Sequence, residues 1–287
     1  MPLNVKAGGS WRTASKVYVR AGGAWVTAKQ LWGYAAGLWR SAWTNEITFI
    51  NTANRTGASI HQLMGSPTLP GTYVFINQAT ITAGATSFAL RTGSFPSGST
   101  LVVVNQGYIL GRGGDGGNGT GAAGGPGGTA LYVDYPCTVD NAAGYIFGGG
   151  GGGGGAYIYN NNGDGVRAGG GGGAGADGGA AGASAANWAN GSNKSITRQA
   201  AAGTQSTGGV GAIGAFVPNI INAYAYGGSG GGPGTAGAAG SIDIGKAGSS
   251  PNGYGAGGAA GAAILKNGLA VTVTAGNNTT QIKGAIV

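Results

Sequence analysis

Short runs of β-branched and aromatic residues recur between residues 46 and 110, and turn residues separate them. Ile47 to Ile50, Tyr73 to Ile76 and Leu101 to Val104 have this pattern, which is typical of β-strands. Proline and glycine follow the runs and mark turns. The pattern predicts a β-structured neck over residues 46–110, and a similar piece near the end of the chain predicts closing β-strands over residues 263–287.

A repeat with a period of 14 residues occupies the start of the chain. Each copy has a strand, a glycine turn and a second strand, which predicts a hairpin. A unit of this size cannot bury its own tryptophan, so the copies stack as a small tryptophan-cored module or pack on a partner. We therefore expect an attachment module over residues 1–45. Its candidate contact residues are Trp11, Trp25 and Trp39, which lie in register, and Arg12, Arg20 and Arg40.

Glycine makes up 68 of the 287 residues and is concentrated between residues 111 and 262, where residues 148–155 are all glycine. Collagen is excluded because glycine does not keep to every third position. A flexible linker is disfavoured because Tyr, Ile and Trp interrupt the glycine blocks. Composition leaves the linker open beside a third option, a bundle of polyglycine-II helices, which are extended rods with three residues per turn that bond only to their neighbours. Eight residues rising about 3.1 Å each would span about 25 Å.

Five segments containing aromatic, Asn and charged residues interrupt the glycine blocks. If each block crosses the bundle once, successive segments leave the bundle at opposite ends. A block that crosses twice, such as 169–182, would change this order. Under single crossings, segments 129–147, 183–207 and 241–252 share one end, and segments 156–168 and 215–226 share the other.

Charged residues are rare and unevenly placed. They make up 8% of the chain, the net charge is +8, and residues 1–43 contain Lys and Arg but no acidic residue. This basic stretch is a solvated surface or binds an acidic protein or a nucleic acid. A protein partner is favoured because no nucleic-acid-binding motif is present. A signal peptide and a membrane span are not expected, so we expect synthesis in a cytoplasm.

The candidate catalytic and metal-binding motifs each lack a residue or an element that their chemistry requires. The single His61 and single Cys137 exclude a histidine-based triad and a disulfide framework within the chain. Gly111 to Gly116 fits a dinucleotide-binding string, but no helix pattern follows it. Asn160 to Gly165 resembles the start of a calcium loop, but glycine stands where the bidentate Glu is required. We expect no enzymatic activity, no cofactor and no bound metal.

Residues 102–131 resemble the glycine-rich receptor-binding proteins of tailed bacteriophages. This stretch runs from Val102 through Asn105-Gln-Gly-Tyr-Ile into the glycine blocks and ends at Leu131. The alternation of glycine blocks with aromatic segments is similar to the tip adhesins of T-even-like long tail fibres. The resemblance implies a polyglycine-II sandwich over residues 111–262 with loops that contact an outer-membrane protein or a surface glycan of the host. The fold class expected is all-β and irregular, with an N-terminal β-repeat module, a β-neck, this sandwich and little α-helix.

We therefore interpret the chain as a virion protein, a tail adhesin that docks through its N-terminal module to a fibre or tail-tip protein. A homotrimer is plausible. Alternatives are a structural or assembly protein of the fibre, an ice-binding protein, and a glycan depolymerase. Aromatic side chains would give rigid contacts and Asn adaptable hydrogen bonds, although each residue could instead pack the bundle edge. The candidate receptor contacts are Tyr157, Tyr159, Asn161, Arg167, Trp188, Asn190, Lys194, Arg198, Tyr224, Tyr226 and Tyr254.

Overall fold

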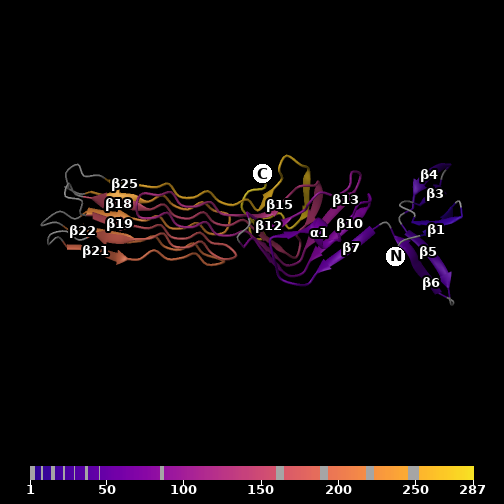
Figure 1. Cartoon of the computed structure of the whole chain (residues 1–287), viewed down its shortest axis with the longest axis horizontal. Helices are drawn as coiled ribbons and strands as arrows, with labels where there is room; N and C mark the ends of the chain where they lie inside the picture. Colours follow the sequence, from indigo (N-terminus) through magenta and orange to yellow (C-terminus); the bar gives the residue numbers. More distant parts are fainter. Residues whose placement is uncertain are drawn as a thin grey trace.

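The protein is described from a computed structural model. The described residues are 4–7, 9–13, 17–21, 23–28, 30–35, 38–44, 46–84, 87–159, 165–187, 193–217, 223–244 and 252–287. They are mostly β-strands, with a single turn of helix, α1 (Ile60–Leu63). Figure 1 shows an elongated molecule with small hairpins at one end, a body of parallel sheets, a set of parallel rods and a second group of strands at the far end. The expectation of an all-β fold with little helix is confirmed.

Three hairpins form the N-terminal region. They pair β1 (Asn4–Ala7) with β2 (Ser10–Thr13), β3 (Tyr18–Ala21) with β4 (Ala24–Thr27), and β5 (Gln30–Ala35) with β6 (Leu38–Thr44). The first two turn at Gly9 and Gly23, which have φ of 82° and 84°, a region that glycine enters without strain. The tryptophans pair at equivalent places, opposite Lys6, Arg20 and Tyr34. The predicted hairpin repeat is confirmed.

The body is a solenoid with three walls, each a parallel sheet. Each coil of the chain adds one strand to each wall in turn, so neighbouring coils pair along their whole path. The first wall contains β7 (Glu46–Asn51), β10 (Thr72–Asn77), β13 (Thr100–Asn105), β16 (Cys137–Asp140) and β27 (Val271–Ala275). The second contains β8 (Arg55–Thr56), β11 (Thr80–Thr82), β14 (Tyr108–Leu110), β17 (Tyr145–Phe147) and β28 (Ile282–Lys283). The third contains β9 (Ala58–Ser59), β12 (Phe88–Arg91), β15 (Thr129–Tyr132) and β26 (Ile264–Leu265).

The solenoid interior is apolar, with a line of buried asparagines at one corner. Inward residues from successive coils stack, and Tyr73, Phe75, Ile81 and Leu90 are fully buried. A buried Asn ends the first-wall strand in each of the first three coils and follows it directly in the fourth. Their side-chain amides form a chain in which Asn51 donates to Asn77 at 2.9 Å, Asn77 to Asn105 at 2.9 Å and Asn105 to Asn141 at 2.8 Å. Buried amides are tolerated here because each finds a partner in the next coil.

The glycine-rich region is inserted into the solenoid. The chain leaves after β14 and returns at β15, then leaves again after β17 and returns at β26. Both insertions therefore lie at the corner between the second and third walls. Segment 129–147, which we expected at an end of the bundle, instead supplies β15, β16 and β17 to the three walls. That expectation was wrong because the segment's strands complete the sheets begun by residues 46–110.

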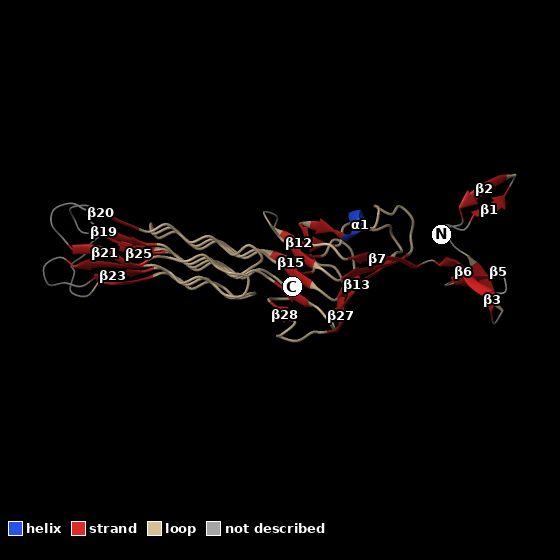
Figure 2. Cartoon of the chain, turned by 90° about the horizontal axis from the view of Figure 1, so that it is seen from below, coloured by secondary structure: helices blue, strands red, loops and turns tan. Residues whose placement is uncertain are grey.

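The insertions form rods that run out from the solenoid and back again (Figures 1 and 2). Three turns next to the solenoid reverse the chain. Two of them use Gly178 and Gly234, with φ of 58° and 66°, and the third lies between Thr204 and Thr207. The rods that run outward are 111–118, 148–155, 179–184, 208–212 and 235–240, and those that return are 122–128, 169–175, 199–204, 227–232 and 255–262.

The rod of eight glycines, 148–155, lies at the centre of the bundle. Every one of its N–H groups donates to a neighbouring segment and every carbonyl accepts from another. The partner changes with a period of three: Gly149 and Gly152 donate to Gly128 and Gly125, whereas Gly150 donates to Ala174 of another rod, all at 2.7–2.9 Å. This is the bonding of a polyglycine-II helix, which has three residues per turn and no internal hydrogen bonds.

Close packing explains why this rod contains only glycine. All eight residues are buried. A Cβ atom added at any of them would lie between 1.8 and 2.1 Å from a neighbouring backbone oxygen, far inside van der Waals contact. Outer rods contact neighbours on fewer sides and accept alanine, as at Ala236, Ala238 and Ala239.

The outward and returning rods place the interrupting segments at one end. Strands from 156–168, 183–207, 215–226 and 241–254 gather in two adjoining sheets at the end far from the hairpins. The expected alternation of segments between two ends is therefore wrong. Block 169–182 crosses the bundle twice, because it reverses next to the solenoid at Gly178.

Candidate functional site

Two four-stranded antiparallel sheets form the distal tip. The first contains β20 (Ala185–Asn187), β19 (Gly165–Ala168), β18 (Ala156–Tyr159) and β25 (Asn252–Tyr254). The second contains β21 (Asn193–Arg198), β22 (Ile213–Val217), β23 (Ala223–Tyr226) and β24 (Ser241–Asp243). The sheets pack face to face through the buried Ile158 and Val166 and through small residues, among them Ala156, Ala168, Ala223 and Ala225. Larger side chains of β18 and β23 therefore point outward, because residues alternate along a strand.

The outer face of the first sheet carries Tyr157, Tyr159 and Arg167, which we call the first wall of the tip. The two tyrosine rings lie 5.5 Å apart. The Arg167 guanidinium lies 5.4 Å from the centre of the Tyr159 ring, and its Nε donates to the Tyr159 hydroxyl. These contacts hold the charged group on an aromatic surface, which is a favourable place for a cation.

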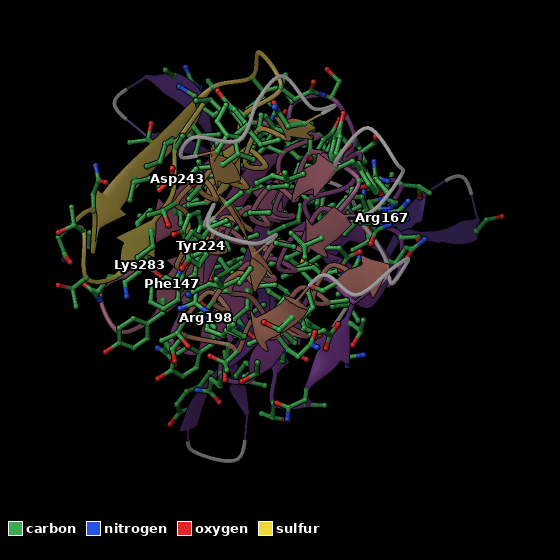
Figure 3. The ribbon with its side chains drawn as sticks, turned by 90° about the vertical axis from the view of Figure 1, so that its left-hand side faces the viewer. Phe147, Arg167, Arg198, Tyr224, Asp243 and Lys283 are labelled. Atoms are coloured by element: carbon green, nitrogen blue, oxygen red, sulfur yellow. The ribbon has the colours of Figure 1, made fainter. Side chains whose placement is uncertain are left out.

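The outer face of the second sheet carries Tyr224, Tyr226 and Arg198, the second wall of the tip. The tyrosine rings stack at 5.9 Å, and Arg198 Nε donates to the carbonyl of Gly211 at 2.8 Å. In the end-on view of Figure 3, Arg167 lies on one side of the tip, and Tyr224 and Arg198 lie on another. Each of the two walls of the tip therefore presents two tyrosines from one strand and an arginine whose orientation a hydrogen bond fixes.

The two wall arginines keep donors for an external acceptor. Neither forms an ion pair with any carboxylate in the described part of the chain, where the ion pairs are Arg91–Asp134 and Arg112–Asp115. An unpaired guanidinium can bind a carboxylate or a phosphate with two parallel hydrogen bonds. The hydrogen bond to Asp134 raises the pKa of Arg91, so that arginine is committed to the solenoid.

The remaining candidates divide between the tip and residues that are not described. Tyr254 ends β25 and is 58% exposed, and the backbone of Lys194 lies in β21. Asn161, Trp188 and Asn190 lie outside the described residues. The described candidates are thus brought to one end of the molecule. Sequence reasoning missed Asp243, which pairs with Tyr224 in the second sheet. The alternation of Ser241, Ile242 and Asp243 was its only signal.

The candidate attachment residues lie in the hairpins at the other end. Arg20 is exposed, while the side chains of Trp11, Trp25, Trp39, Arg12 and Arg40 are outside the description. Tyr34, opposite Trp39, is 64% exposed and was missed, because it occupies the position that lysine or arginine holds in the other two copies.

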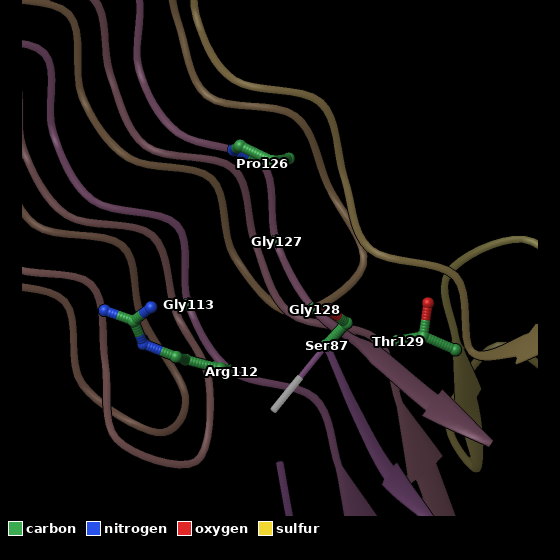
Figure 4. Close-up of a pocket in the computed structure, with 7 residues that line it drawn as sticks. All are labelled: Ser87, Arg112, Gly113, Pro126, Gly127, Gly128 and Thr129. Carbon is green, nitrogen blue, oxygen red and sulfur yellow. The ribbon is translucent and has the colours of Figure 1, made fainter. Parts of the chain in front are cut away.

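Other possible sites offer less. A hollow of about 300 Å³ lies where the rods leave the solenoid, and Figure 4 shows Ser87, Arg112, Pro126 and Thr129 around it. Its arginine is already paired with Asp115 at 3.1 Å. The described residues contain no group of three or more His, Cys, Asp or Glu side chains that could hold a metal. None of the helices described is long and apolar enough to span a membrane.

Comparison with known proteins gives one match. A family model described as "Phage tail fibre adhesin Gp38" matches residues 43–287. The matched range covers the solenoid, the rods and the tip and begins near the end of β6, so most of the hairpin region lies outside it. No curated protein and no solved structure matches the chain.

Proposed function

The chain belongs to the phage tail fibre adhesin family Gp38, so it is a non-enzymatic protein at the tail fibre tip of a phage virion, and from this premise we propose that its distal tip binds the host receptor. The receptor is an outer-membrane protein or a surface glycan of the host cell. The observation that carries the proposal is the gathering of Tyr157, Tyr159, Arg167, Tyr224 and Tyr226 at the end farthest from the hairpins.

The chemistry of the tip suits binding rather than catalysis. Tyrosine provides a large amphipathic contact area with few rotatable bonds, and arginine provides charged hydrogen bonds. Backbone-bonded rods support the tip sheets, so the walls keep their shape before they meet a receptor. A surface that is already ordered loses less entropy on binding.

The three hairpins are proposed to attach the adhesin to a fibre or tail-tip protein. They lie at the end opposite the tip (Figures 1 and 2), and residues 1–43 carry basic residues without acidic ones. A basic surface favours encounter with an acidic partner. The tryptophans of the repeat would supply the apolar anchors that such interfaces usually contain.

Binding of purified protein to host cells tests the receptor proposal. We expect the wild-type protein to bind cells and to block phage adsorption. A Tyr159→Ala/Arg167→Ala variant and a Tyr224→Ala/Tyr226→Ala variant should each bind at least tenfold more weakly, since loss of a central aromatic or arginine contact typically costs about 2 kcal/mol or more. The matched control is Tyr108→Ala, which removes a stacked tyrosine, 42% exposed, from the solenoid.

Two results would count against the proposal. One is equal binding by the wild type, both wall variants and the control when all four keep the same unfolding midpoint. The other is full binding by a chain in which the four segments 160–164, 188–192, 218–222 and 245–251 are replaced by Gly-Ser sequences of equal length. Together, these results would show that the tip does not contact the receptor.

A further inference from the structure

The hollow on the flank of the molecule, where the rods leave the solenoid, is built from two parts of the fold. Arg112 and Pro126 come from the rods, whereas Ser87 precedes β12 and Thr129 begins β15 on the third wall of the solenoid (Figure 4). The other lining residues are glycines, which present only backbone to it. We call this space of about 300 Å³ the root hollow. Its volume is that of a small-molecule site.

The polar side chains of the root hollow keep unused hydrogen-bonding groups. The hydroxyls of Ser87 and Thr129 have no hydrogen-bond partner among the described residues. Arg112 donates through Nη2 to both carboxylate oxygens of Asp115, at 3.1 Å, and its Nε and Nη1 donate to no described residue. The Arg112 and Asp115 side chains are 42% and 50% exposed. A ligand in the hollow therefore meets free donors and free acceptors together.

The charge balance of the root hollow favours a neutral ligand. Arg112 is the one charged side chain among the described residues that line it, and Asp115 neutralises this charge. An anion would lie close to the Asp115 carboxylate and a cation close to the Arg112 guanidinium, so neither sign of charge gains much. A hydroxyl group suits both, because it accepts from a guanidinium and donates to a carboxylate.

An aromatic shelf continues from the root hollow across the third wall. Phe88 pairs with Thr129 in the sheet, and its ring lies 5.6 Å from that of Tyr132. The Arg91 guanidinium lies 5.3 Å from the Phe88 ring and 5.8 Å from the Tyr132 ring, and its ion pair with Asp134 holds it there. Phe88, Arg91 and Tyr132, which form the aromatic shelf, are all partly exposed. Such a surface suits the apolar face of a ligand.

A sugar unit has the chemistry that the root hollow and the aromatic shelf share. Its ring has a face of C–H groups, and its rim carries hydroxyls that both donate and accept. The hollow also lies where a cell-surface glycan can reach it. Rod 111–118 runs from the hollow towards the tip, and its eight residues span about 25 Å at about 3.1 Å each. A glycan chain that extends from the cell surface along the rods would meet the hollow once the tip has docked.

We propose that the root hollow and the aromatic shelf bind a neutral sugar unit of a host surface glycan, as a contact separate from the tip. Arg112 and the hydroxyls of Ser87 and Thr129 bind the hydroxyls of the sugar, and the aromatic shelf packs on its C–H face. The inference rests on the proposed function, because an adhesin that works at a cell surface is the one that meets such a glycan. A weak second contact keeps the adhesin near the cell while the tip finds its receptor.

Nuclear magnetic resonance of the ¹⁵N-labelled full-length protein tests the site directly. The probes are glucose, galactose, mannose and N-acetylglucosamine, then polysaccharide extracted from host cells, with inorganic phosphate as the charged comparison. We expect at least one of the neutral sugars to shift the amide signals of Arg112, Gly127 and Thr129. The dissociation constant should be about 1–10 mM, the range for so small a ligand. Phosphate should leave these signals in place.

The variant Ser87→Ala/Thr129→Val removes both free hydroxyls with little change in side-chain size. Neither hydroxyl bonds to a described residue, so the unfolding midpoint should not fall. The dissociation constant for the sugar should rise at least fivefold, because two hydrogen bonds to the ligand are lost. The matched control is Thr80→Val/Thr138→Val, which removes two hydroxyls from the second and first walls. Its affinity for the sugar should equal that of the wild type.

Three results of the binding experiment would overturn the proposal. They are the absence of shifts with every neutral sugar and with the host polysaccharide, equal affinities for the double variant and the control, and tighter binding of phosphate than of any sugar. The last result would make the hollow an anion site.

Attachment to host cells tests the source of the sugar. The initial rate of attachment should fall about threefold in the double variant and not in the control, while the amount bound at equilibrium stays the same. An unchanged rate, with sugar binding intact in the wild type, would refute a host glycan as the source. Failure of the wild-type protein to attach to cells would refute the receptor function of the tip. The sugar site would still stand on its amide shifts, because these are measured without cells.

Discussion

Replacing one glycine at the centre of the bundle tests whether the rods form a solid. In Gly152→Ala the added Cβ atom would lie 2.0 Å from the carbonyl oxygen of Asp115 and 2.5 Å from its carbonyl carbon. Carbon and oxygen atoms without a normal hydrogen bond meet at about 3.3 Å, so rod 111–118 must move by about 1.3 Å. The atoms that clash are backbone, and no side-chain rotation relieves them.

The magnitude follows from the hydrogen bonds on either side of the clash. Gly114 donates to Gly150 and Gly117 to Gly153, each at 2.8 Å. A displacement of this size would stretch both beyond hydrogen-bonding distance. Leaving a buried backbone group unpaired costs about 1–3 kcal/mol, so Gly152→Ala should destabilise the bundle by about 2–6 kcal/mol.

Gly232→Ala is the matched control within the same bundle. Its added Cβ would meet only the Thr235 hydroxyl, at 3.6 Å, and its φ is not positive. Alanine also reduces the entropy of the unfolded chain, so this variant should be neutral or up to about 1 kcal/mol more stable. Thermal unfolding followed by calorimetry measures both variants. Equal midpoints for Gly152→Ala and Gly232→Ala would refute the claim that backbone contact between rods holds the bundle together.

The remaining predictions concern the solenoid and the rods. Asn77→Ala should cost about 2–4 kcal/mol in urea unfolding, because the buried Asn51 amide loses its acceptor and the buried Asn105 carbonyl loses its donor, whereas Gln78→Ala on the exposed surface should change stability by less than about 1 kcal/mol. Burial raises the pKa of Cys137 from 9.0 to about 12, so the thiol of the unfolded chain ionises first as pH rises. The free energy of unfolding should therefore fall by about 1.4 kcal/mol per pH unit above pH 9. Cys137→Val should remove this part of the pH dependence. Amide protons of residues 148–155 should exchange far more slowly than those of a free peptide, and rapid exchange would contradict the bonding described here.

The sequence alone was sufficient to predict the glycine rods and the hairpins. Aromatic segments between the glycine blocks argued against a linker, and the family resemblance favoured rods that bond to their neighbours. The tryptophan repeat fixes three hairpins because its turn glycines recur at one spacing.

The solenoid was harder to recognise because its coils are interrupted. The phrases that start at Asn105 and at Asn141 were visible as related, and they are the same corner of two successive coils. Their meaning was hidden because the strand that completes the second of these coils, β26, follows only after the long insertion that starts at Gly148. Long-range pairing of this kind leaves no periodic signal in the sequence.

The direction of the rods could not be read from the sequence either. Reversal at Gly178 and Gly234 requires a positive φ, which usually makes a glycine stand out from its neighbours. The pairs Asp177-Gly178 and Pro233-Gly234 are turn signals, but the same pairs occur within straight rods as Asp115-Gly116 and Pro126-Gly127, so they do not show where the chain reverses. The prediction therefore placed the segments of the tip at two opposite ends of the bundle, although it identified these segments as the ones that carry candidate contact residues.

The rods also dictate what the tip can be. Closely packed backbones enter the two tip sheets side by side. Ile158 and Val166, together with Ala156, Ala168, Ala223 and Ala225, fill the space between the sheets. The inner face of the tip is thus fixed by the bundle, and variation is left to the outer walls and to the connections between strands. Because the rods bond mainly through backbone groups, with a few bonds from side chains such as Asp115, substitutions at Tyr159 or Arg167 should change what the tip binds while leaving the bundle beneath it intact.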